Sequence, residues 1–140
     1  LIERYRMEDA EYAIMTIGSM TGAGKDAVDA ARGRGEKIGL VKVKTYRPFP
    51  AEQIAEALAN LKALGVVDRS VSFGFDCGPL FQDTMGALTR APRRIPAMSF
   101  IGGLSGADLT IGHIDGVIRR TAELVQGAAP GETVWLNEKD

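Results

Sequence analysis

The chain has little of the chemistry that most metal and redox sites require. Cys77 is its only cysteine and His113 its only histidine. An internal disulfide is therefore excluded, and so is a zinc site built from Cys and His ligands. An iron–sulfur cluster held by this chain alone is excluded as well, because it would need about four thiolates.

The sequence also lacks an excess of charge of one sign and any long apolar run. Its net charge is −1, its pI is about 5.9, and its basic residues are scattered, so it carries no electrostatic footprint for nucleic acid. No apolar run is long enough to span a bilayer, and no secretory signal is visible. The cytoplasm is the default compartment, and neither a nucleic acid nor a membrane partner is expected.

The length fits one domain, and apolar content allows a full core. The chain starts at Leu1 rather than at methionine. We expect residues 1–140 to form one domain, with residues 1–10 a linker from a preceding domain or a strand broken mid-run.

Short apolar runs alternate with helical patterns along the chain. The runs predict strands at about 13–17, 38–45, 66–73 and 97–101, and a further edge strand at 133–136. Helical patterns begin near 23, 51 and 79 and after 108; Gly65 is expected to end the second, and Asp108 or Thr110 to cap the last. This order predicts an α/β fold of three layers: a mostly parallel open sheet, helices on both faces, and an antiparallel edge strand.

Residues 37–50 form the stretch around which the chain is organised. It begins as a strand and stops at Pro48 and Pro50, because proline cannot continue a central ladder. Tyr46 and Arg47 therefore sit at the carboxyl end of a strand, where ligands and partners gather in open α/β sheets. A guanidinium there suits carboxylates and phosphates, although a structural ion pair is the simpler role for Arg47.

A glycine-rich turn follows the first strand. Gly22 to Ala27 fits G-x-G-x-x-[GA] formally, but residues 18–21 separate it from the strand, and the second strand ends without an acid to hold a ribose. A strand-to-helix turn that needs small residues is the simpler interpretation. A weak anion site at this helix start is the alternative, and its candidate residues are Gly18, Ser19, Gly22 and Gly24.

No residue set combines a nucleophile, a base and an orienting group, so no catalytic residue is predicted. His113 is expected to be a surface or capping residue. Cys77 is expected to be a buried structural thiol.

Several motifs together resemble one family, the second domain of 2-oxoacid:ferredoxin oxidoreductases of the pyruvate:ferredoxin oxidoreductase group. The motifs, in chain order, are Asp9-Ala10-Glu11, Gly18-Ser19, Gly35 to Leu40, Tyr46-Arg47-Pro48-Phe49-Pro50, Val67-Asp68-Arg69, Gly78-Pro79-Leu80-Phe81-Gln82-Asp83 and Gly103 to Thr110. The late loop departs from the family pattern, with Ser105 and Ala107 where a glycine and an arginine are usual.

The resemblance implies a fold like the transketolase C-terminal domain, following a thiamine-pyrimidine domain in an alpha subunit. The complete enzyme would decarboxylate a 2-oxoacid with thiamine diphosphate, magnesium, iron–sulfur clusters and CoA, and would reduce ferredoxin. This domain would bind none of these cofactors alone and would contact other domains or subunits. Tyr46, Arg47 and Asp108 are its candidate substrate or interface residues.

Two other classes stay open. One is the equivalent domain of a transketolase or of a 2-oxoacid dehydrogenase E1 component. The other is a stand-alone module that binds a nucleotide or CoA at residues 18–24.

Overall fold

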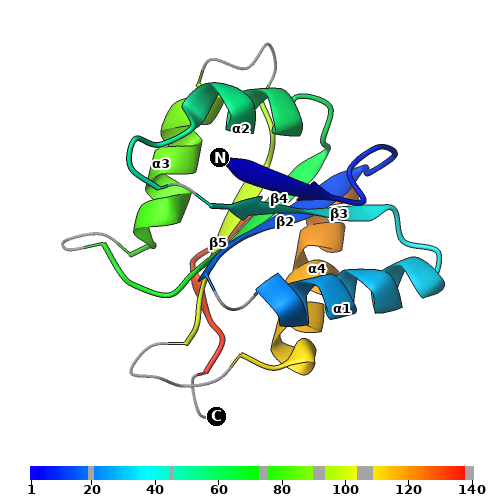
Figure 1. The fold of residues 1–140 in the computed structure, drawn as a ribbon. Helices are drawn as coiled ribbons and strands as arrows, with labels where there is room; N and C mark the ends of the chain where they lie inside the picture. The colour runs from blue at the N-terminus through cyan, green and yellow to red at the C-terminus, as the bar shows by residue number, and fades with distance from the viewer. Residues whose placement is uncertain (19–20, 45, 73–75, 90–93, 104–108, 138–140) are drawn as a thin grey trace.

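A computed structural model describes residues 1–18, 21–44, 46–72, 76–89, 94–103 and 109–137 (Figure 1). Within these ranges the chain forms a six-stranded sheet in the order β1-β3-β2-β4-β5-β6. The strands are β1 (Ile2–Tyr5), β2 (Tyr12–Ile17), β3 (Ile38–Val43), β4 (Ala63–Asp68), β5 (Ala97–Ile101) and β6 (Val134–Trp135). The helices are α1 (Thr21–Gly33), α2 (Ala51–Leu58), α3 (Pro79–Leu88) and α4 (Ile111–Val125).

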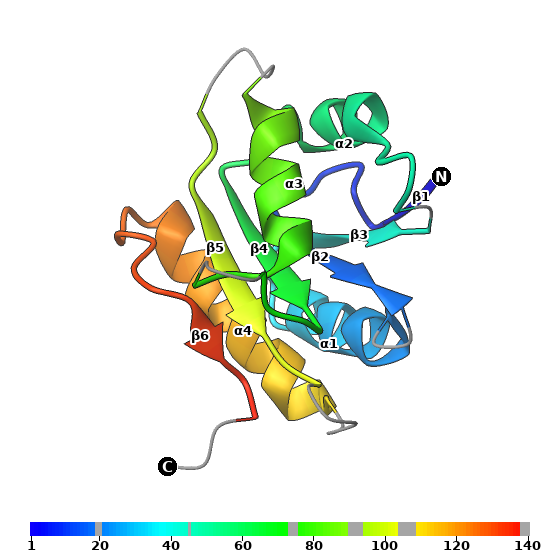
Figure 2. The same cartoon turned by 90° about the vertical axis from the view of Figure 1, so that its left-hand side faces the viewer.

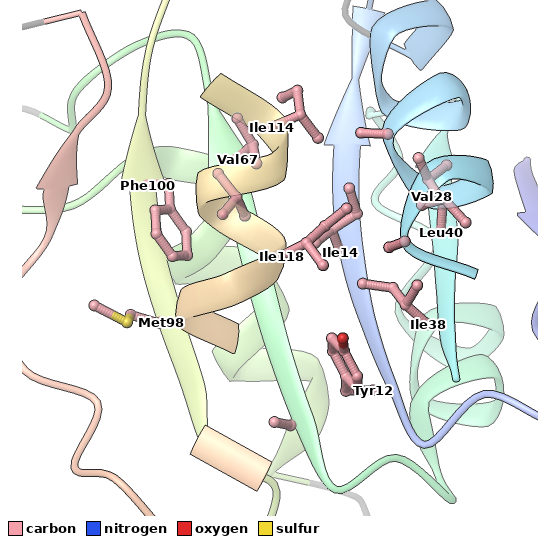
Figure 3. Close-up of a cluster of buried hydrophobic side chains, with 14 of the residues drawn as sticks. Tyr12, Ile14, Val28, Ile38, Leu40, Val67, Met98, Phe100, Ile114 and Ile118 are labelled. Carbon is pink, nitrogen blue, oxygen red and sulfur yellow. The ribbon is translucent and has the colours of Figure 1, made fainter. Parts of the chain in front are cut away.

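The sheet is the middle of three layers. Helices α1 and α4 cover one face, and α2 and α3 cover the other (Figures 1 and 2). Strand β2 shows why both faces are covered: Tyr12 and Ile14 enter the cluster under α1 and α4, which Figure 3 shows, whereas Ala13 and Met15 enter the opposite cluster. Successive side chains of a strand alternate between faces, so a continuous apolar run must be buried on both. The predicted fold class is confirmed.

The antiparallel edge strand lies at the amino end of the chain. Strand β1 pairs antiparallel with β3, Ile2 opposite Val43 and Tyr5 opposite Leu40, whereas β6 runs parallel to β5. The Tyr5 hydroxyl donates to both carboxylate oxygens of Asp29 on α1, at 2.8 and 2.9 Å. Of the two expectations for residues 1–10, the strand holds for Ile2–Tyr5, which are fastened to the first helix, and the connection to a preceding domain stays a prediction.

Two predicted boundaries near Gly65 are wrong. Helix α2 ends at Leu58 rather than near residue 61, and β4 occupies Ala63–Asp68 rather than 66–73. Gly65 lies inside β4, where a methyl group would overlap the Thr121 hydroxyl of α4 and crowd Phe100. The glycine permits close approach of a helix to the sheet, a role that local sequence does not distinguish from helix termination.

We expect Gly65→Ala to lower the free energy of unfolding by about 1–3 kcal/mol, because α4 must move away from the sheet. The measurement is urea unfolding of the 140-residue chain. Gly86→Ala is the matched control, since Gly86 lies exposed on α3 with no atom of the described residues within 4 Å of the added methyl group. It should be neutral or stabilising by up to about 1 kcal/mol. Equal effects at the two positions would contradict the packing role of Gly65.

Candidate functional site

The parallel strands end at one edge of the sheet, which we call the carboxyl edge. From β2 the chain passes to α1 on one face, and from the neighbouring β4 it passes to α3 on the other. Neighbouring strands whose connections diverge in this way define the topological switch point, where open α/β sheets bind ligands and partners. This edge carries Gly18 after β2, Tyr46 and Arg47 after β3, Asp68 at the end of β4, and Gly103 after β5.

Asp68 joins the sheet to the start of α3. Its side chain is 2% exposed, and its two carboxylate oxygens accept from the backbone N–H groups of Leu80 at 2.8 Å and Phe81 at 3.1 Å. These N–H groups belong to the first turn of α3, whose N–H groups have no partner within the helix. Gly78 completes the contact, because a side chain there would overlap the Asp68 carboxylate. Asp68 thus occupies the helix N-terminus as an internal anion.

The pKa of Asp68 is raised to about 6, in the first place because burial disfavours the charged carboxylate. The two backbone N–H donors oppose this by stabilising the negative charge, and the nearby Asp83 carboxylate adds to the rise. Desolvation is the larger effect, so the carboxyl group titrates closer to neutrality than an exposed aspartate.

Asp83, one turn further along α3, holds the two residues singled out after β3. The Tyr46 hydroxyl donates to Asp83 Oδ2 at 2.6 Å, and the Arg47 guanidinium reaches the same oxygen at 3.3 Å. Arg47 also lies over the Tyr46 ring, 4.3 Å from its centroid, and donates to the Tyr46 carbonyl at 3.0 Å. Burial, followed by the bond to Asp83, raises the pKa of Tyr46 to about 12. The phenol is therefore a hydrogen-bond donor at neutral pH.

Arg47 keeps most of its surface in solvent. Its side chain is 67% exposed, and the next peptide bond, Arg47–Pro48, is cis. Tyr46 packs edge-on against Phe49, with 5.7 Å between ring centroids. The Tyr46 ring and the Asp83 carboxylate thus hold one side of the Arg47 guanidinium, and its other side is exposed to solvent.

The other half of the carboxyl edge is fixed by backbone contacts. Gly102 N donates to the Asp68 carbonyl at 2.9 Å, and the Arg69 guanidinium reaches the Gly103 carbonyl at 3.5 Å. Gly103 has a φ of +76°, which favours glycine, and its N–H donates to Asn137 Oδ1 at 2.6 Å. The residues at the ends of β4 and β5 are therefore hydrogen-bonded to each other and to the segment that follows β6.

The four anion-site candidates after β2 fall into different environments. Gly18 has a φ of +77° at the strand exit, and Gly22 is exposed. Gly24 faces β3, where a methyl group would lie 2.8 Å from Leu40 Cδ1, so close helix-to-strand packing accounts for this glycine. Ser19 lies outside the described residues, as does Asp108 among the substrate or interface candidates.

His113 has the capping role predicted for it. It is the third residue of α4, where its Nδ1 accepts from the backbone N–H of Thr110 at 3.0 Å, while its own N–H donates to the Thr110 hydroxyl at 3.2 Å. This reciprocal pair is a capping box, and Thr110 is the N-cap.

Cys77 is half-buried rather than fully buried. Its carbonyl accepts from Ser72 N at 2.9 Å. Burial, and then the Asp68 and Asp76 carboxylates, raise the pKa of its thiol, which makes the thiolate less available as a nucleophile.

Asp68 and Asp83 were not among the predicted site residues, although both lie inside motifs that resemble the family. The available signal was an acid at the end of a buried strand, followed about ten residues later by a glycine and a helix-starting proline. Among the described residues, no group of three or more His, Cys, Asp or Glu side chains is placed to hold a metal ion. No described helix is both long and apolar enough to cross a membrane.

The mostly parallel sheet with helices on both faces is a transketolase-like fold. Two solved structures share this fold. One is a split-gene transketolase in an inactive beta4 tetramer, with a TM-score of 0.66 and 16% identity, and the match covers 84% of this chain and 40% of that chain. The other is the 2-oxoglutarate:ferredoxin oxidoreductase of Magnetococcus marinus, with a TM-score of 0.63 and 20% identity, and the match covers 86% of this chain and 19% of that chain.

The sequence identifies the family within this class. Residues 10–114 match the model of the pyruvate:ferredoxin oxidoreductase core domain II, and the chain belongs to this family. The resemblance drawn from the motifs is thus confirmed.

Full-length relatives extend well beyond the matched region. The alpha subunit of an NADH-dependent phenylglyoxylate dehydrogenase from Aromatoleum evansii is 61% identical over 141 residues, which cover 100% of this chain and 34% of that protein. The pyruvate synthase subunit PorA of Methanosarcina barkeri is 37% identical over 100% of this chain and 35% of its own length. The chain therefore spans about a third of the length of these relatives.

The raised pKa of Asp68 predicts how stability depends on pH. Its contribution to the free energy of unfolding is fully present below pH 3.8 and is lost as the pH rises through about 6. Between pH 5 and 7.5 the wild type should therefore lose about 1 kcal/mol more than Asp68→Asn, which cannot titrate. Urea unfolding across this pH range measures the difference. Asp26→Asn, on the exposed surface of α1, is the control and should keep the wild-type profile. Parallel profiles for wild type and Asp68→Asn would contradict the assignment.

Proposed function

We propose that this chain is domain II of the alpha subunit of a thiamine diphosphate-dependent oxidoreductase that acts on an aromatic 2-oxoacid. The observation that carries the proposal is the 61% identity to the phenylglyoxylate dehydrogenase alpha subunit along the whole chain, against 37% for a pyruvate synthase subunit. The complete enzyme would convert the 2-oxoacid and CoA into an acyl-CoA and CO₂ and pass two electrons to an acceptor such as ferredoxin or NAD⁺.

In this proposal the domain organises contacts and does not perform the chemistry. The carboxyl edge supplies an ordered phenol, a guanidinium held by Asp83, and a capped helix, but no set of nucleophile and base converges there among the described residues. Tyr46 and Arg47 are the proposed contact residues for a neighbouring domain or for one wall of a substrate channel, together with Asp108. The glycines after β2 are a further, weaker candidate for contact with an anionic group.

The cofactors of such an enzyme are assigned to its other domains and subunits. With one cysteine in the chain, no iron–sulfur cluster can be held by this domain alone. The described residues likewise offer no set of ligands for the magnesium that accompanies thiamine diphosphate. The residues of this domain therefore contribute positioning and electrostatics. A cytoplasmic location is part of the proposal.

The substrate class is tested with the full-length alpha chain purified together with the other subunits of its enzyme. Phenylglyoxylate, CoA and either NAD⁺ or ferredoxin should give acyl-CoA at least about tenfold faster, in kcat/KM, than pyruvate, a difference of about 1.4 kcal/mol in transition-state stabilisation. A preference for pyruvate would contradict the aromatic substrate. The 140-residue chain, given the same reactants and thiamine diphosphate, should show no turnover, and activity of this chain alone would refute the scaffold role.

The contact role of Arg47 is tested by charge reversal. Arg47→Glu should weaken assembly of the alpha chain with its partners at least about tenfold, but should change the domain's free energy of unfolding by less than about 1 kcal/mol, because exposed ion pairs contribute little. Arg119→Glu is a matched control: Arg119 is 64% exposed, and it pairs with Asp115 at 2.7 Å on a different surface. Analytical ultracentrifugation and urea unfolding separate the two effects. If Arg47→Glu unfolds the domain and Arg119→Glu does not, Arg47 is a purely structural residue.

A further inference from the structure

The large apolar side chains that are exposed among the described residues all lie at the carboxyl edge. They are Leu1, Val71, Ile111 and Trp135, and they are between 37% and 57% exposed. The Leu1 carbonyl accepts from the backbone directly after β3, and Val71 lies in the loop between β4 and α3. Ile111 is the first residue of α4, and Trp135 pairs with the last residue of β5.

A single exposed apolar side chain is common on proteins and needs no partner. Leu1 is a terminal residue, for which exposure is ordinary. The other three come from separate segments, and their position at one edge of the sheet is what requires an explanation. The opposite edge, where the parallel strands begin, is charged: Lys37 and Lys62 lie beside Glu11, at 3.9 and 3.4 Å.

Trp135 and Ile111 lie on opposite faces of the sheet. Val134 and Leu136 pack against the cluster under α1 and α4, so Trp135 between them points toward the α2–α3 face. Ile111 belongs to α4, which covers the other face. A partner that covers both side chains must therefore cross the carboxyl edge itself, and a helix lying on one face of the sheet cannot do so.

The segments that carry these side chains are held by hydrogen bonds. Thr133, directly before β6, donates from its hydroxyl group to the Asp76 carbonyl in the loop that leads to α3. Thr110 caps α4 directly before Ile111. A surface that is fixed before docking loses less conformational entropy when it is covered.

Both ends of the described chain lie at this edge. The Leu1 carbonyl accepts from Lys44 N at 2.9 Å after β3, and the Asn137 side chain accepts from Gly103 N at 2.6 Å after β5. The chain spans about a third of its relatives, so residues added at either end start from the carboxyl edge, beside the outer strands β1 and β6 (Figures 1 and 2). A surface tethered there has an effective concentration on the order of millimolar.

We propose that the half of the carboxyl edge that carries Val71, Ile111 and Trp135 is buried against an apolar surface of the remaining residues of the same alpha subunit. The inference rests on the proposed function, because it takes this chain as one domain of such a subunit. The three side chains are uncharged, so burial of apolar area favours the contact. Tryptophan is among the residues that most often dominate an interface.

The test uses the full-length alpha chain without its partner subunits, and Trp135, the one tryptophan of these 140 residues, is the reporter. Ile111→Glu places a charge in the buried contact. The first turn of α4 contains no acidic residue, and a negative charge there favours the helix, so the domain itself should stay folded. Undocking returns Trp135 to 37% exposure, and its labelling by hydroxyl radicals, read by mass spectrometry, should become at least about threefold faster.

Ala30→Glu is the matched control. Ala30 is exposed on α1, away from the carboxyl edge, and the change from an apolar to an acidic side chain is the same. It should leave the labelling of Trp135 at the wild-type rate. Equal rates in wild type and Ile111→Glu, or equal increases in the two variants, overturn the proposal.

The remaining outcomes are assigned in the same way. If Ile111→Glu unfolds the alpha chain by circular dichroism, Ile111→Gln takes its place and should label Trp135 at least about twofold faster; no increase overturns the proposal. Slow labelling of the wild type that is lost on about hundredfold dilution identifies a second copy of the chain as the cover. Slow labelling that appears only after the partner subunits are added identifies one of them. Either result overturns docking within the subunit.

The failure of the proposed function is distinguishable from the failure of the docking. In the first case the wild-type alpha chain does not assemble with the other subunits or does not turn over a 2-oxoacid, whatever the labelling of Trp135. If the wild type assembles and turns over while Ile111→Glu leaves the labelling unchanged, only the docking is refuted.

Discussion

The carboxylate of Asp68 at the start of α3 is the contact on which the carboxyl edge depends. It is made across twelve residues of sequence, from the last residue of a central strand to the first turn of the helix that follows. Burying a carboxylate is costly, and the two N–H donors of the helix offset only part of that cost, as its raised pKa shows. The contact fixes the position of α3 on the sheet, because a shift of this helix would leave the buried Asp68 carboxylate without its two N–H donors. Because α3 carries Asp83, the positions of Tyr46 and Arg47 follow from it.

The family motifs acquire a physical meaning in this arrangement. Val67-Asp68-Arg69 and the segment that starts at Gly78 are two halves of one helix cap, and Gly78 is small because the Asp68 carboxylate needs its space. The Tyr46-Arg47 motif is bound to the same helix one turn later, and Arg69 extends the connection to Gly103 after β5. Segments dispersed between Tyr46 and Gly103 therefore meet at one edge of the sheet. Together they form one hydrogen-bonded surface at the ends of β3, β4 and β5.

How far the sequence could predict this structure depends on the range of the interaction involved. The strand at 97–101 and the end of β3 ahead of Pro48 follow from local rules, and the structure has them nearly as predicted. Gly65 was misassigned because its reason lies in Thr121, more than fifty residues away. The strand β1 was ambiguous because its stability comes from Val43 and Asp29, which no local pattern reveals. Asp68 escaped notice for the same reason: a buried acid is recognised only when its donors are known.

The capping box of α4 has a consequence for the tautomeric state of the chain's one histidine. Since Nδ1 of His113 accepts a hydrogen bond from the Thr110 amide, the neutral ring must carry its proton on Nε2. The δ nitrogen of this imidazole is thereby occupied by the first turn of α4, and only the ε nitrogen remains for any further contact.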